Sequence, residues 1–179
     1  MTRRPPAPPL PAKPFSVEEA AERLGNTMNL FDTSAEAQAE LDASGAVLLE
    51  DARDILSDRV TDGEFCFAIP FLLQIWFALV PPGCRAPEVP FDDLEKSFTT
   101  HLRQAEAANR AGNPKKLEAF VKDCPQPGLM LAVASAILKS APDFPKEIQP
   151  GPAPQLVILA LLKTVVQELD QALRHQGSS

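Results

Sequence analysis

Tyrosine is absent from this chain of 179 residues, and cysteine and glycine are scarce. The three cysteines, Cys66, Cys84 and Cys124, stand far apart and belong to no Cys-x-x-Cys motif. This spacing argues against a disulfide framework and against a structural zinc site. The eight glycines form neither Gly-x-Gly-x-x-Gly nor a P-loop. Without a phosphate-binding loop, we expect no nucleotide or other cofactor.

Basic residues are few in the first third of the chain. Residues 15–62 contain 12 acidic residues against Arg23, Arg53 and Arg59, a net charge of −9. An acidic surface repels phosphate backbones, whereas proteins that bind nucleic acid usually carry a basic face. Residues 16–25 look like the first helix of a helix-turn-helix, but the following residues supply no basic recognition helix. We therefore expect no nucleic-acid partner.

The sequence also lacks a hydrophobic run of membrane-spanning length. Its most apolar segment, Phe65–Val80, has 16 residues and includes Pro70 and Gln74. A transmembrane helix needs about 20 apolar residues. No apolar run follows the arginines near the N-terminus, so no secretory signal is predicted. These features favour a cytoplasmic protein without a membrane partner.

Proline is abundant, with 19 residues, and it separates the predicted elements. The proline-rich residues 1–14 are expected to form a disordered tail, because proline fixes φ and removes hydrogen-bond donors. Residues 15–179 are expected to form a single helical domain. Apolar periodicity and capping residues predict helices at about 16–24, 34–59, 66–80, 92–111, 114–122, 128–140 and 155–175.

The fold class predicted from these helices is all-α, a single irregular bundle of six or seven helices. Its C-terminal helix is expected to lie buried at the centre, because its first half is apolar on nearly every side. Ser16 with Glu19 predicts a capping box, and Gly25 is expected to end that helix. Residues 61–63, Thr-Asp-Gly, are expected to break the chain before the apolar helix. Asn113 is the predicted cap of a helix that opens with Pro114.

The predicted helix at 34–59 is amphipathic, with apolar residues on one stripe and carboxylates on the other side. An acidic helix of this kind speeds the capture of a basic partner and discourages wrong ones. The leading hypothesis is a non-catalytic protein–protein interaction module, an adaptor of the chaperone, immunity-protein or antitoxin kind, with a basic protein partner. The carboxylates expected to bind that partner are Glu36, Glu40, Glu50, Asp51, Asp54 and Asp58.

An enzymatic alternative uses two carboxylate pairs, Glu19 with Glu22 and Asp51 with Asp54. They resemble the ExxE and ExxD pairs by which all-helical nucleotide pyrophosphatases hold magnesium, although Asp51 stands where that pattern has glutamate. The resemblance implies a magnesium-dependent pyrophosphatase with these four metal ligands. The competing interpretation is a solvated acidic face that binds no metal and has no catalytic residue.

A third feature is a surplus of large apolar residues in the segment around Trp76. Three interpretations are left open for Phe71, Gln74, Trp76 and Phe77: a plain core, an interface in a homo-oligomer or with a partner, or a pocket for a small apolar ligand. In the pocket, Gln74 would be the polar contact. His101 flanks the apolar stripe of its helix and is expected at the surface or its boundary.

Overall fold

The structure is a computed structural model that describes residues 13–31, 39, 45–80 and 87–176. These residues contain helices and connecting segments but no strand, which confirms the all-α prediction. Seven α-helices and one 3-10 turn, η2, follow in the order α1 Val17–Phe31, α3 Ala46–Leu56, α4 Asp62–Leu79, α5 Phe91–Arg110, α6 Pro114–Lys122, α7 Pro127–Ser140, η2 Ala141–Asp143 and α8 Pro152–Gln176.

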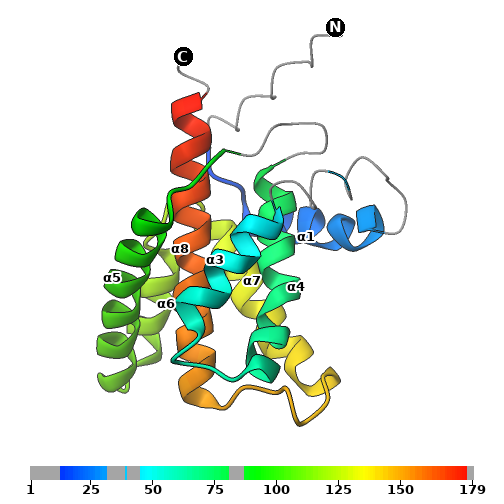
Figure 1. Ribbon diagram of the computed structural model, residues 1–179. Coiled ribbons are helices and arrows are strands. Elements are labelled where there is room, and N and C mark those ends of the chain that lie inside the picture. The colour runs from blue at the N-terminus through cyan, green and yellow to red at the C-terminus, as the bar shows by residue number, and fades with distance from the viewer. Residues whose placement is uncertain (1–12, 32–38, 40–44, 81–86, 177–179) are drawn as a thin grey trace, which may run out of the picture.

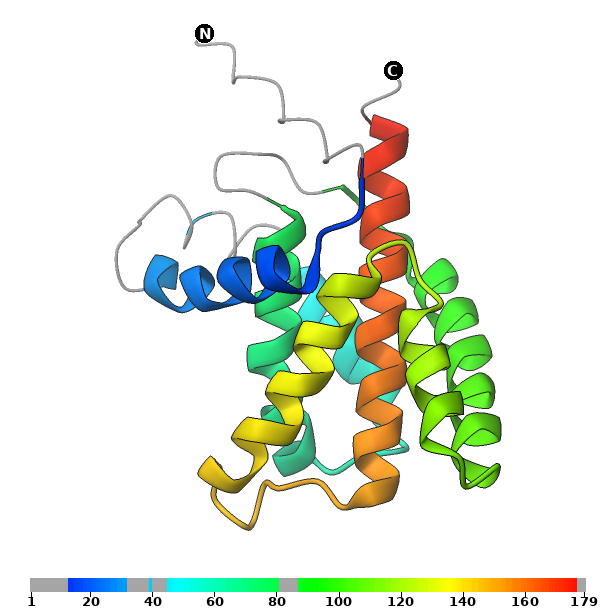
Figure 2. The same ribbon diagram turned by 180° about the vertical axis from the view of Figure 1, so that it is seen from behind.

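Helix α8 is the centre of the bundle, as predicted. All of its residues from Ile158 to Val166 are buried. Helices α5 and α6 lie on one side of α8, and α4 and α7 lie on the other (Figure 1). Seen from behind, α1 crosses α7 and α4 at one end of the bundle (Figure 2). A helix that is apolar on nearly all sides is stable only when neighbours cover every side, so the others pack around it.

Two predicted helix boundaries are wrong. Helix α1 does not end at Gly25 but continues to Phe31. Gly25 lies inside the helix without the positive φ of a C-terminal glycine, which Gly112 alone adopts among the described glycines. An internal glycine costs a helix only about 1 kcal/mol, so Gly25 by itself does not force the helix to end. The predicted capping box is confirmed, because Ser16 and Glu19 exchange side-chain-to-backbone hydrogen bonds of 2.8 and 3.1 Å.

Helix α4 begins at Asp62, four residues before the predicted start. The expected break at 61–63 is instead a helix start: Thr61 is the N-cap, and it forms a capping box with Glu64. This box satisfies the first free N–H groups of the helix, so Gly63 is accommodated in the first turn. Asn113 caps α6 as predicted, and its side chain accepts a hydrogen bond of 3.0 Å from the Lys115 N–H.

Helix α4 is long and apolar enough to span a membrane, judged by length and composition alone. However, 56% of that stretch is buried inside the protein, where α4 packs against α8 and α1. A buried core helix meets the same criteria, so this feature is weak support for a membrane span. Its role in the described structure is to form one wall of the core.

Part of the predicted organisation lies outside the described residues. This applies to residues 1–12 of the predicted tail and to most of the first half of the predicted helix at 34–59. The described part of that helix is α3, which begins after Gly45. It packs on α4 through Leu48, Ala52, Ile55 and Leu56.

Candidate functional site

Four carboxylates on α3 and in the turn after it form what we call the acidic stripe: Glu50, Asp51 and Asp54 lie on the helix, and Asp58 lies in the turn. Asp54 follows Glu50 by four residues and Asp51 by three, which places the three helical carboxylates on the side of α3 away from the buried Leu48 and Ala52. Glu50, Asp54 and Asp58 are exposed, and Asp51 is half-buried. The apolar Val47, 54% exposed, extends the same face toward the start of α3.

Electrostatic repulsion within the acidic stripe is visible at Asp51. Its pKa is raised, first by partial burial and then by the charges of Asp54 and Glu50. The two nearby arginines point elsewhere. Arg53 pairs with Asp62 at 3.0 Å, and Arg59 donates to a backbone carbonyl and lies over the Phe98 ring. Among the described residues, no ion pair neutralises the stripe.

Two of the six carboxylates predicted to bind a partner, Glu36 and Glu40, lie outside the described residues. The other four make up the acidic stripe. Glu50, Asp51 and Asp54 lie on α3 as the sequence predicted, whereas Asp58 lies in the turn after the helix. The structure adds that the nearby Arg53 and Arg59 are engaged with other groups.

The four carboxylates of the magnesium alternative are not brought together. Glu19 is engaged in the capping box of α1, while Asp51 and Asp54 lie on α3. Helices α1 and α3 both pack on α4, and their main contacts are not with each other. Within the described part of the chain, no group of three or more His, Cys, Asp or Glu side chains has the geometry to hold a metal ion.

The apolar residues proposed for a pocket or interface are buried in the core. Phe71, Trp76 and Phe77 are all at most 5% exposed. Trp76 and Phe77 make an edge-to-face ring contact at 5.0 Å. Gln74 is half-buried, and its Oε1 has no hydrogen-bond partner among the described residues.

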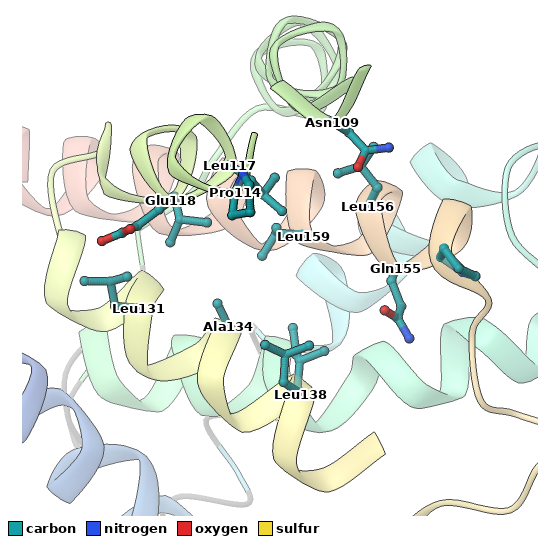
Figure 3. A pocket seen from close by; sticks show the side chains of 13 residues that line it. Asn109, Pro114, Leu117, Glu118, Leu131, Ala134, Leu138, Gln155, Leu156 and Leu159 are labelled. Atoms are coloured by element: carbon teal, nitrogen blue, oxygen red, sulfur yellow. The ribbon is translucent and has the colours of Figure 1, made fainter. Parts of the chain in front are cut away.

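A surface groove of about 400 Å³ lies elsewhere, between α6, α7 and the start of α8. In Figure 3, Leu117 and Leu159 approach it from one side, and Ala134 and Leu138 approach from the α7 side. We call it the α6–α8 groove. It is lined by Asn109, Pro114, Leu117, Glu118, Val121, Leu131, Ala134, Ile137, Leu138, Pro152, Gln155, Leu156 and Leu159.

The α6–α8 groove is apolar along its floor and polar at its ends. Glu118 lies at one end, and Asn109 and Gln155 lie at the other (Figure 3). Leu138 is 73% exposed, the largest exposed fraction among the large apolar side chains described. Sequence periodicity could not locate this groove, because it depends on how three helices sit relative to one another.

A buried polar chain links α8 to the segment that precedes α1. Asp170, buried on α8, accepts hydrogen bonds from Gln126 at 2.7 Å and from Arg174 at 2.6 and 3.1 Å. Gln126 is also fully buried and accepts a hydrogen bond of 3.0 Å from the Phe15 N–H. Each buried group thus has partners, as a stable interior requires. These contacts anchor the entry to α1.

The second buried polar group contains His101, which is only 5% exposed. The expectation of a surface or boundary position is therefore wrong. Nδ1 of His101 lies 2.9 Å from the Thr164 hydroxyl, which also donates to the Ala160 carbonyl. Burial and the nearby Lys163 lower the pKa of His101 to about 4. The ring is thus neutral at neutral pH.

Lys163 lies beside this histidine, on α8 at the centre of the bundle, and is 1% exposed. Its Nζ donates a hydrogen bond of 2.8 Å to the Phe120 carbonyl and lies 4.1 Å from the centre of the Phe120 ring. Burial lowers the pKa of Lys163, and Asp123 partly offsets that effect. Neither Lys163 nor His101 lines the α6–α8 groove. A substrate in that groove would not meet them.

Comparison of the chain with protein-family models, with curated proteins and with solved structures finds no match. The chemistry of the surfaces described above is therefore the basis for a functional proposal.

Proposed function

We propose that this protein is a non-catalytic interaction module that presents the acidic stripe of α3 to a basic surface of a protein partner. The observation that carries the proposal is geometric: Glu50, Asp51 and Asp54 lie close together on α3, and none of them has an ion pair among the described residues, so their like charges repel one another. A basic partner would relieve this repulsion when it binds.

The surroundings of the stripe support the same function. Three of its four carboxylates are exposed, and the exposed Val47 supplies an apolar contact on the same face. A charged rim beside an apolar contact is typical of protein interfaces. Complementary charge mainly speeds association and selects the partner, so binding should weaken as salt concentration rises.

The test compares two double variants of the whole protein. Glu50→Gln with Asp54→Asn removes two charges from the stripe. Glu95→Gln with Glu106→Gln removes two charges from exposed positions of α5 and is the matched control. Wild-type protein is immobilised, exposed to an extract of its own cells, and retained proteins are identified by mass spectrometry.

We expect a retained protein with a basic surface. Two exposed pairs at about 0.5 kcal/mol each predict a loss of affinity of about fivefold for the stripe variant, measured with the purified partner. The α5 control should bind like the wild type. If no basic protein is retained, or if both double variants bind it equally, the acidic stripe is not the interface.

A further inference from the structure

The α6–α8 groove differs from the rest of the surface in charge as well as in hydrophobicity. Helix α6 carries three lysines against Glu118, a net charge of +2, and α7 carries only Lys139, a charge of +1. None of the other five described α-helices has a net positive charge. The whole chain, by contrast, has a net charge of −7.

Exposed lysines are present on both helices that form the walls of the groove, although neither lysine is itself a lining residue. Lys115 follows the lining residue Pro114 in α6, and Lys139 follows the lining residue Leu138 in α7. Both lysines are exposed. The one carboxylate among the lining residues, Glu118, is already paired with Lys122 at 2.5 Å. An occupant of the groove therefore meets an apolar floor between two helices that each contribute positive charge.

We propose that the α6–α8 groove binds an amphipathic helix of a partner protein, with acidic residues flanking its apolar face. Grooves between helices receive such segments through apolar side chains at positions i, i+3, i+4 and i+7. The open floor beside Leu138 takes these side chains, and the net positive charge of α6 and α7 attracts the acidic flanks. This surface is separate from α3, so the inference does not rest on the acidic stripe.

The probe is a fluorescent helical peptide of about 18 residues, with leucines at i, i+3, i+4 and i+7 and glutamates on both flanks. A second peptide keeps the leucines and replaces each glutamate with lysine. Binding to the full-length protein is measured by fluorescence anisotropy. We expect the glutamate peptide to bind at least about tenfold more tightly than the lysine peptide, with an affinity that falls as salt is added.

Variants of the protein locate the binding site. Leu138→Ser should weaken binding of the glutamate peptide about tenfold, because apolar anchors dominate such interfaces. Lys115→Gln with Lys139→Gln should reduce the preference between the two peptides. Val47→Ser, which alters an exposed apolar residue on α3, is the matched control and should leave binding unchanged. Circular dichroism verifies that each variant is folded.

Four results would overturn the proposal. Equal affinity for the two peptides, or no binding of either, would remove the acidic helix as the occupant. Unchanged binding by Leu138→Ser would place the peptide on another surface. A wild-type dimer in sedimentation that Leu138→Ser dissociates would identify a second copy of this chain as the occupant.

Discussion

Replacement of Gly128 by alanine tests the tightest contact in the fold. Gly128 lies in the first turn of α7, directly under the segment that enters α1. A Cβ atom at this position would lie 2.2 Å from the Phe15 carbonyl oxygen and 2.8 Å from the Ser16 carbonyl carbon. Both are backbone atoms, so no side-chain rotation relieves the clash. The two segments have to move apart.

The cost of that movement follows from what it breaks. The Phe15 N–H donates to the buried Gln126 side chain at 3.0 Å, and losing a buried hydrogen bond costs about 1–3 kcal/mol. Phe15 is itself buried, and partial exposure of its ring costs about 1–2 kcal/mol more. We therefore expect Gly128→Ala to lower the free energy of unfolding by about 3–4 kcal/mol, a large part of the stability of a typical domain.

The assay is equilibrium unfolding in urea, followed by the fluorescence of Trp76, the only tryptophan. Gly25→Ala is the matched control, because Gly25 lies inside α1 and no heavy atom would lie within 4 Å of its new Cβ. That variant should gain about 0.5–1 kcal/mol from helix propensity. If Gly128→Ala loses less than about 1 kcal/mol, the close approach of α7 to the entry of α1 is refuted.

Two further predictions concern buried polar groups on or against α8. The pKa of His101 is lowered from 6.5 to about 4 in the folded protein. Between these two pH values the unfolded chain binds a proton at His101 and the folded protein does not. The stability that the neutral, buried His101 provides is therefore complete above about pH 6.5 and is lost as the pH falls toward 4. The full loss in the free energy of unfolding is about 3 kcal/mol. Urea titrations between pH 7 and 5 should show this free energy falling with pH, and His101→Gln should make it less dependent on pH. Asp170→Asn weakens the hydrogen bonds that the buried carboxylate accepts from Arg174, and because Arg174 is 44% exposed the cost should be about 1–2 kcal/mol. Thermal unfolding measures that loss, with the exposed pair removed by Glu118→Gln as control; equal melting temperatures for the two variants would contradict it.

The helical fold follows from local signals that the sequence displays openly. Ser16 with Glu19 and Asn113 before Pro114 mark helix starts that the structure confirms. The apolar first half of α8 indicates its central place. The wrong boundaries arose at two glycines: Gly25 suggested an end at a position where α1 continues, and Gly63 obscured the capping box of Thr61 with Glu64.

The surfaces are less predictable than the helices. The acidic stripe belongs to one continuous segment, α3 and the turn after it, so sequence spacing was sufficient to find it. The α6–α8 groove combines side chains from residues 109 to 159, and only tertiary packing brings them together. The burial of Lys163 could have been predicted from the sequence, because this charged residue stands within the apolar run "ILALLKTVV". A charge so enclosed needs an internal partner.

The internal partner of Lys163 is the backbone carbonyl of Phe120, near the end of α6. The hydrogen bonds around it explain why this carbonyl is available. The last carbonyl groups of a helix have no intrahelical donor. The Cys124 N–H bonds to the Lys122 carbonyl instead of that of Phe120, and Pro125 has no N–H for the carbonyl of Val121.

The two remaining carbonyls at the end of α6 are satisfied by side chains. Lys163 donates to Phe120, and the Cys124 thiol, whose pKa burial raises to about 11, donates to Val121. Lys163 and Cys124 thus complete the end of α6, and Gln126 and Asp170 do the same for the entry to α1. Lys163, Gln126 and the half-buried Cys124 are therefore polar groups whose partners include backbone groups at helix ends, which gives each of them a structural role.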